Sequence, residues 1–303
     1  MKQSNIREGF ANVNGVRLYY KIVGDGEPIV ISHGGPGLDH NYILPLGELA
    51  DDYKIIFYDQ RSTGNSSGEV TADSITLNNF AMDLEELRTK LNLGKINLIG
   101  HSWGGGLAVY YAVKYPTNLR SLTVLAGSGL DTKYFEQYYE NVKKKTLPED
   151  ETAMKEIKLS DAFKNRHVEA VKKYYRIATK PFFYNPSLVD RLDFFVSENT
   201  ANNQRRAAAF IMRDISSFDI YDKLSAINCP TLIVCGDADP EPQWAPHTLH
   251  KLLPQSRLVS LKNTGHFMFI ESPQQTLSLI RAFLRNGKPA KTPVKWQTEL
   301  AAL

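Results

Sequence analysis

One serine of the chain stands in a sequence context that makes a side-chain hydroxyl reactive. The residues from Ile96 to Tyr111 read INLIGHSWGGGLAVYY, in which a short apolar run ends in GHSWG and a helical spacing of apolar residues follows. A G-x-S-x-G sequence between a strand and a helix bends the chain sharply and exposes the serine hydroxyl at a helix N-terminus, where free N–H groups favour negative charge. We therefore predict that Ser102 is the nucleophile of an acyl-transfer reaction, rather than part of an ordinary glycine-rich turn.

A serine hydroxyl attacks a carbonyl group efficiently only when a base removes its proton. Of the seven histidines, His266 is the best candidate, because it lies in the loop sequence NTGHF that follows the last predicted strand. There it comes after both the serine and an acidic loop, which is the chain order that this motif requires. The base must be neutral, so activity should fall as the pH drops through its pKa, which is about 6.5 if unperturbed.

The base in turn needs a carboxylate that fixes its tautomer and stabilises the imidazolium ion. The loop after the predicted strand Thr231–Cys235 reads GDADPE and offers two aspartates. We prefer Asp239, which lies farther from the strand end and so reaches more easily toward His266. Asp237 stays open as the alternative acid, with capping of the turn as its structural role.

The tetrahedral intermediate of acyl transfer needs two N–H donors for its oxyanion. The backbone of Trp103, directly after the serine, is expected to supply one of them. The second should come from HGGPG, the loop after the predicted strand Ile29–Ser32, where Gly35 allows close approach of the backbone. No metal ion or organic cofactor is expected, because His247 and His250 have ligand-like spacing but no carboxylate or cysteine partner nearby in sequence.

These residues must be held by strands and helices that alternate along the chain. Strands are predicted at Val16–Val23, Ile29–Ser32, Lys54–Tyr58, Ile96–Ile99, Leu119–Ala126, Thr231–Cys235 and Arg257–Leu261, and helices at Leu77–Leu91 and Leu277–Leu284. Several strands are apolar throughout, which is typical of an α/β fold with a mostly parallel sheet covered by helices on both faces. The reactive loops all follow strands, as expected for the carboxyl edge of such a sheet.

The alternation of strands and helices breaks between about residues 129 and 215. This stretch is charged, helix-like and rich in aromatic residues, with no convincing strand pattern. We predict that residues 129–215 form a helical cap over the strand ends, and that residues 1–128 and 216–303 together form the catalytic domain. Most of the aromatic side chains should pack the cap itself, and a minority should line a pocket.

The composition is that of an ordinary globular protein and limits the classes of partner. The chain has 303 residues, 42% of them hydrophobic and 23% charged, and its formal net charge of +3 is too small to indicate nucleic-acid binding. Cys229 and Cys235 are expected to be buried free thiols, with one disulfide between them as the open alternative. Without an apolar signal core or a membrane-spanning window, we expect a cytoplasmic protein that acts on a small molecule or a short peptide. Its oligomeric state is left open.

Over nearly its whole length the chain resembles the α/β-hydrolase superfamily, and within it the proline iminopeptidase group of serine aminopeptidases. The sequences that carry the resemblance are HGGPG at 33–37, DQR at 59–61 and SWGG at 102–105. In that group the second glycine of HGGPG and the residue after the serine form the oxyanion hole, which implies Gly35 and Trp103. The acid of the group lies at the fourth position of a Gly-x-x-Asp loop, which implies Asp239.

The same group holds the free α-amine of its substrate with glutamates from the cap and from the acid loop. One of them commonly follows the catalytic aspartate directly, where this chain has Pro240 and then Glu241. Glu241, and Glu198 in the predicted cap, are the amine-binding residues that the resemblance implies. Two further differences are His101 before the serine, where proline-specific members usually have glycine, and Ser62 directly after DQR.

We therefore expect a serine hydrolase that forms an acyl-enzyme and, as the resemblance implies, removes N-terminal residues, proline above all, from small peptides or amides. A carboxylesterase or lactonase acting on small acyl esters is the alternative, which the shifted Glu241 and the presence of His101 favour. A binding protein without turnover on the same scaffold is a third hypothesis, and the complete set of serine, histidine and aspartate argues against it.

Overall fold

One mixed sheet forms the centre of the protein. A computed structural model of the chain describes residues 5–127, 132–193, 197–216 and 220–286. Within these ranges eight strands form a single sheet in the order β1-β2-β4-β3-β5-β6-β7-β8. They are β1 (Ile6–Val13), β2 (Val16–Val23), β3 (Glu27–Ser32), β4 (Tyr53–Tyr58), β5 (Ile96–His101), β6 (Leu119–Leu125), β7 (Thr231–Gly236) and β8 (Ser256–Leu261). The pairs β1–β2 and β2–β4 are antiparallel and the other neighbours are parallel, which confirms the predicted mostly parallel sheet.

Both faces of this sheet are buried, because successive residues of the central strands point into different core layers. On β3, Ile29 and Ile31 belong to one hydrophobic core and Val30 between them belongs to the other. On β4, Ile55 and Ile56 are divided between the two cores in the same way. A strand buried on both sides has to be apolar at every position, which is why these strands read as continuous apolar runs.

Helices supply the outer wall of each core. The core that contains Val30 is completed by α1 (Leu77–Lys90), α2 (Trp103–Lys114) and α8 (Trp244–Leu252). The other core is completed by the 3-10 helix η1 (Asn41–Asp51), α9 (Met268–Glu271) and α10 (Pro273–Asn286). Both predicted helices are present as α1 and α10. Shorter 3-10 helices are η2 (Pro116–Asn118), η3 (Lys180–Phe182), η4 (Pro186–Arg191) and η5 (Tyr221–Ala226).

The strand β1 was not predicted, and its position explains why. It lies at the edge of the sheet and pairs only with β2. Its sequence IREGFANV has no apolar run, and its side chains Ile6 and Phe10 are 57% and 47% exposed. On this strand Ala11 and Val13 are buried in the core that contains Val30, so too few apolar positions alternate along it for the sequence to indicate a strand.

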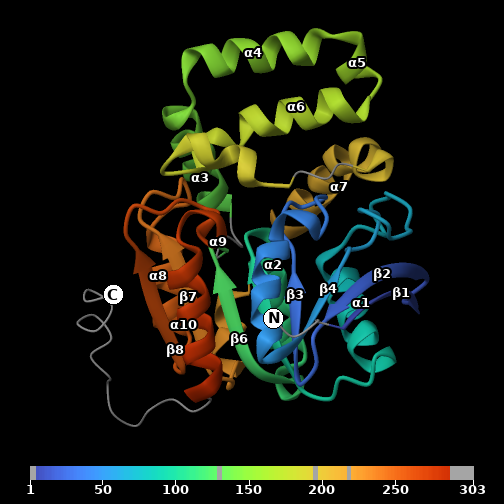
Figure 1. Ribbon diagram of the computed structural model, residues 1–303, viewed down its shortest axis with the longest axis vertical. Coiled ribbons are helices and arrows are strands. Elements are labelled where there is room, and N and C mark those ends of the chain that lie inside the picture. The colour runs from blue at the N-terminus through green and yellow to red at the C-terminus, as the bar shows by residue number, and fades with distance from the viewer. Residues whose placement is uncertain (1–4, 128–131, 194–196, 217–219, 287–303) are drawn as a thin grey trace.

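The regular elements described between residues 132 and 216 are all helical, and we call this part the helical segment. It contains α3 (Thr132–Lys145), α4 (Pro148–Leu159), α5 (Asp161–Lys164), α6 (Val168–Ala178) and α7 (Glu198–Ser216), together with η3 and η4. Figure 1 shows α4, α5 and α6 beyond the end of the sheet toward which β6 points, with α3 and α7 nearer the sheet. The division into a cap and a catalytic domain stays a prediction, and its first boundary, at residues 128 and 129, lies outside the described residues.

The structure bears on two further features of the sequence, the state of the two cysteines and the character of the helices. Cys229 and Cys235 are both buried free thiols. Among the described helices, none combines the length and the apolar character that crossing a lipid bilayer requires.

Candidate active site

Ser102 lies at the sharp turn between β5 and α2, in a backbone conformation that few L-residues adopt. Its φ is 55° and its ψ is −126°, and its N–H donates to the carbonyl of Leu125 at 2.9 Å. Glycine is required close by, because a Cβ on Gly104 would lie 2.2 Å from the carbonyl oxygen of Ser32 and 2.4 Å from that of His33. This close packing holds the serine in a strained conformation at the start of α2, which is the geometry of a nucleophile elbow.

The loop that contains HGGPG packs against this turn and is tied to it by Gln60. The side-chain amide of Gln60 donates to the carbonyl of His33 at 2.7 Å, and its amide oxygen accepts the indole N–H of Trp103 at 2.9 Å. Nε2 of His33 accepts the backbone N–H of Gln60 at 3.1 Å, so its Nδ1–H donates to the carbonyl of Gly34 at 2.9 Å. Burial lowers the pKa of His33 to about 4, which keeps the ring in the neutral form that these bonds need.

Gly35 is an exposed residue of the same loop and has a φ of +133°. A Cβ at this position would lie 2.6 Å from the backbone nitrogen of Gly37, so a larger residue would be strained here. A Cβ on the preceding Gly34 would lie 3.0 Å from Cβ of Ser102. The two predicted oxyanion donors, the N–H groups of Gly35 and Trp103, therefore belong to segments that border Ser102.

His266 and Asp239 form a buried hydrogen-bonded pair in the loops after β8 and β7. Nδ1 of His266 lies 2.9 Å from Oδ2 of Asp239, and the two residues are 4% and 7% exposed. The backbone N–H of His266 donates to the carbonyl of Phe182 at 2.7 Å, and the two rings meet edge-on at 5.4 Å between centroids. Asp237, the alternative acid, is exposed and accepts the backbone N–H of Thr264 at 3.4 Å. The structure therefore brings His266 together with Asp239 and not with Asp237.

The loop of His266 also reaches the turn that carries Ser102. The ring of His101, the residue before the serine, lies 4.7 Å from the ring of His266 between centroids. Nε2 of His101 lies 3.0 Å from the carbonyl oxygen of His266. The predicted nucleophile and the predicted base thus belong to segments that touch through His101, although 164 positions separate them in the sequence.

Opposing effects set the pKa of His266. Burial lowers it, whereas the negative charge of Asp239 and its hydrogen bond raise it, as does the charge of Glu241. The charge of Lys145 acts in the lowering direction, and the net result is a pKa above the ordinary value of 6.5. The surroundings of this imidazole therefore stabilise its protonated form, which is the form a base takes after it has accepted a proton.

Glu241 is buried beside this pair. Its Oε1 lies 3.9 Å from Nδ1 of His266, and its backbone N–H donates to Oδ1 of Asp239 at 2.9 Å. Burial and the charge of Asp239 raise the pKa of Glu241 to about 7, against the opposing effects of His266 and a hydrogen bond from Tyr134. A carboxyl group with such a pKa ionises readily when a cation binds next to it.

Glu198 is the second predicted amine-binding residue. It is the first residue of α7 and it is exposed. Among the contacts of the described residues, none joins it to His266 or Glu241. The neighbouring Thr200 accepts the backbone N–H of Gly64 at 3.1 Å, so this end of α7 rests on the loop after β4.

The described residues contain two groups of side chains with the types and spacing of a cation site. One is His266 with Asp239 and Glu241, and the other is Asp39 with His40 and Asp59. In both groups the histidine nitrogen already bonds to an aspartate, so a cation would have to replace that bond.

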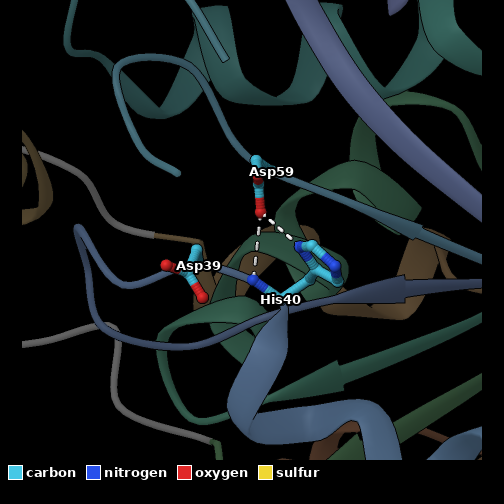
Figure 2. A group of neighbouring side chains, drawn as sticks. All are labelled: Asp39, His40 and Asp59. Atoms are coloured by element: carbon cyan, nitrogen blue, oxygen red, sulfur yellow. Dashed lines mark hydrogen bonds and ion pairs between the residues drawn. The ribbon is translucent and has the colours of Figure 1, made fainter. Parts of the chain in front are cut away.

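Figure 2 shows the second group, in which one oxygen of Asp59 accepts two hydrogen bonds from His40. Oδ1 accepts from Nδ1 of His40 at 2.7 Å and from its backbone N–H at 3.1 Å, and Oδ2 accepts the backbone N–H of Asn65 at 2.8 Å. Oδ2 of Asp39 has no hydrogen-bond partner among the described residues, and burial raises the pKa of Asp39 to about 6, which reduces its charge. We assign this group to anchoring the chain that follows HGGPG and not to metal binding.

Each residue of the DQR sequence has a structural partner that sequence analysis did not identify. Asp59 holds the chain after HGGPG, and Gln60 ties the HGGPG loop to the residue after the serine. Arg61 donates to both carboxylate oxygens of Asp83 on α1, at 2.7 Å and 2.5 Å. Ser62 follows with a φ of 65°, so the chain keeps the left-handed turn that a glycine would favour at this position.

Similarity to known proteins extends over most of the chain. A family model described as the alpha/beta hydrolase fold matches residues 27–273. The chain is 30% identical over 308 residues to a proline iminopeptidase of Saccharolobus solfataricus, with 92% of this chain and 93% of that protein covered. It is 28% identical over 295 residues to a proline iminopeptidase of Heyndrickxia coagulans, with 92% and 99% covered. The crystal structure of VinJ has a similar fold, with a TM-score of 0.70 at 20% identity over 93% of this chain and 99% of that one.

Proposed function

The chain belongs to the α/β-hydrolase family, and on that premise we propose that it is a serine aminopeptidase that cleaves N-terminal residues, proline above all, from small peptides and amides. The observation that carries the proposal is the buried pair of His266 and Asp239 next to the strained turn of Ser102. The similarity to two proline iminopeptidases supports the substrate class.

In the proposed reaction, Oγ of Ser102 attacks the carbonyl carbon of the scissile amide while His266 accepts the hydroxyl proton. Asp239 accepts the Nδ1–H of His266, leaves Nε2 free to act as the base, and stabilises the imidazolium ion. The N–H groups of Gly35 and Trp103 stabilise the oxyanion. Protonation of the leaving amine by His266 breaks the C–N bond and leaves an ester on Ser102. A water molecule, deprotonated by His266, then hydrolyses this ester and restores the free serine.

We assign recognition of the substrate amine to Glu241. An ammonium group that enters a partly dry site loses hydration, and only an ionised or readily ionised partner offsets that loss. Glu241 is 6% exposed, lies beside the proposed base and has a pKa of about 7, so it can ionise as the ammonium group binds. Glu198 is exposed and has no contact with His266 or Glu241 among the described residues, so it serves as the comparison.

We expect Glu241→Gln to impair cleavage of a prolyl arylamide more than cleavage of an acyl ester of similar size. Loss of one partner of a buried charge pair costs about 2 kcal/mol or more, so the arylamide-to-ester ratio of kcat/KM should fall by about 30-fold or more. Any effect of the substitution on His266 should lower kcat/KM for both substrates alike and so cancel in the ratio, because both substrates need that residue. Glu198→Gln should change the ratio less.

Two outcomes of this measurement would contradict different parts of the proposal. An arylamide-to-ester ratio that stays unchanged in Glu241→Gln would overturn the assignment of amine recognition to Glu241. A wild-type enzyme that hydrolyses the ester and leaves the arylamide intact would overturn the aminopeptidase proposal and favour the carboxylesterase or lactonase.

The pH dependence of ester hydrolysis should report His266. Since only the neutral ring accepts a proton, kcat/KM should be highest above the pKa of His266 and fall as the pH drops through a value above 6.5. An uncharged ester is the appropriate substrate, because its own charge does not change with pH. Glu241→Gln removes a charge that raises the pKa of His266, so the acid limb of this variant should move to lower pH. A flat profile between about pH 5 and about pH 8, or a move in the opposite direction, would count against His266 as the base.

A further inference from the structure

A buried chain of hydrogen bonds runs beside Ser102, from the HGGPG loop to the loop of His266. The N–H of Gly34 donates to the hydroxyl of Tyr42 at 2.5 Å, and this hydroxyl lies 2.9 Å from Nδ1 of His101. Nε2 of His101 lies 3.0 Å from the carbonyl oxygen of His266. Tyr42 and His101 are 3% and 1% exposed, so solvent does not reach these bonds.

The chemistry of the partners fixes the position of each proton in this chain. The carbonyl of His266 can only accept, so Nε2 of His101 carries a hydrogen. Burial lowers the pKa of His101 well below its ordinary value, which keeps the ring neutral and leaves Nδ1 as an acceptor. The hydroxyl of Tyr42 therefore donates to Nδ1 and accepts the N–H of Gly34. Removing one member leaves a buried polar group of its neighbour without a partner.

We propose that Tyr42 and His101 are positioning residues that fix the oxyanion-donor loop and the base loop relative to each other on either side of Ser102. The inference rests on the proposed function, because it assigns a catalytic consequence to both loops. Gly34 directly precedes Gly35, the proposed donor, and a Cβ on Gly34 would lie 2.7 Å from the hydroxyl of Tyr42. The backbone that leads into the proposed donor is thus fitted closely against the tyrosine.

Two substitutions interrupt this series of hydrogen bonds at different points. Tyr42→Phe removes the hydroxyl and keeps the ring, which packs against His101, Phe267 and Phe269. His101→Asn keeps an acceptor for Tyr42 and loses the donor to the carbonyl of His266. If Tyr42→Phe fails to fold, His101→Asn carries the test.

The readout is covalent labelling of Ser102 by a fluorophosphonate, which needs the nucleophile, the base and the oxyanion donors but no particular substrate. A misplacement of about 1 Å around reacting atoms can cost about 100-fold, so we expect each variant to be labelled about 10- to 100-fold more slowly. The loss should lie in the limiting rate constant at saturating reagent, while the half-saturating concentration stays within about twofold, because the reagent still binds. The double variant should be no slower than the slower single variant, since both break one network.

Tyr111→Phe is the matched control for the loss of a buried hydroxyl. Tyr111 is fully buried near the far end of α2, and its hydroxyl donates to Oε2 of Glu85 at 2.5 Å. This variant should melt at a lower temperature and be labelled at the wild-type rate.

Labelling of Tyr42→Phe and His101→Asn within about twofold of wild type would overturn the inference, as would equal slowing in Tyr111→Phe. A wild-type protein that is not labelled at Ser102 would instead refute the proposed function, so the two failures are distinguishable.

Discussion

Ser102→Ala should lower kcat on the best substrate of an arylamide and ester panel by about a millionfold, the scale of losing the nucleophile from a serine triad. Alanine keeps the Cβ and removes only the hydroxyl, so the turn at φ 55° can form as before. The loss should therefore appear in kcat while the melting temperature stays close to that of wild type.

Ser121→Ala provides the control for removing a buried serine hydroxyl. Ser121 is 6% exposed and donates to Oδ1 of Asn97 at 2.6 Å, on strands β6 and β5 away from their carboxyl ends. Its loss should cost stability, about 1 kcal/mol, and leave kcat unchanged. A Ser102→Ala protein that retains kcat within about a hundredfold of wild type would show that another group carries the reaction.

Asp239→Asn should lower kcat by about ten-thousandfold, because an amide in place of the carboxylate favours the wrong tautomer of the histidine. Oδ2 of Asp239 accepts from Nδ1 of His266 at 2.9 Å, and Oδ1 accepts the backbone N–H of Glu241 at 2.9 Å. The substitution keeps the shape of the side chain and removes the charge that raises the pKa of His266. Any residual activity should therefore extend to lower pH than that of wild type.

Asp237→Asn is the matched variant in the same loop. Its carboxylate is exposed and accepts a backbone N–H from Thr264 at 3.4 Å, so its loss should leave kcat within a few-fold of wild type. If Asp237→Asn proved the more damaging of the two, the assignment of the acid would have to be reversed.

The placement of the proposed triad could be predicted because each member follows a strand of a parallel sheet. Ser102 follows β5, Asp239 lies after β7 and His266 lies after β8, and the carboxyl ends of parallel strands meet at one edge. The continuous apolar strands and the G-x-S-x-G turn were therefore enough to propose the site. Asp239 was preferred to Asp237 for its place farther along the loop, and the structure pairs Asp239 and not Asp237 with His266.

The residues that link the loops of the site by hydrogen bonds could not be predicted, because their partners are distant in sequence and no local pattern marks them. Tyr42 meets His101 across 59 positions, and His101 meets His266 across 165. Gln60 meets Trp103 across 43 positions, and nothing in the DQR sequence itself indicates this partner. Such contacts depend on how the whole sheet orders its strands, which a single sequence does not reveal.

The two glutamates predicted to bind the substrate amine, Glu241 and Glu198, also show what sequence analysis can place and what it cannot. Glu241 lies in the acid loop, so the position of that loop also placed it beside His266. Glu198 lies in the helical segment, where apolar spacing predicts helices but not their packing on the sheet. Its exposure at the start of α7 was therefore outside the reach of sequence analysis.

The identity of the nucleophile is tested most directly by mapping a fluorophosphonate adduct. The labelled protein would be digested and the modified residue located by mass spectrometry, with Ser102→Ala treated in parallel. A single adduct on Ser102, coincident with complete loss of hydrolysis and absent from the variant, is the expected result. An adduct on another residue, or full hydrolytic activity after Ser102 has been labelled, would contradict the account.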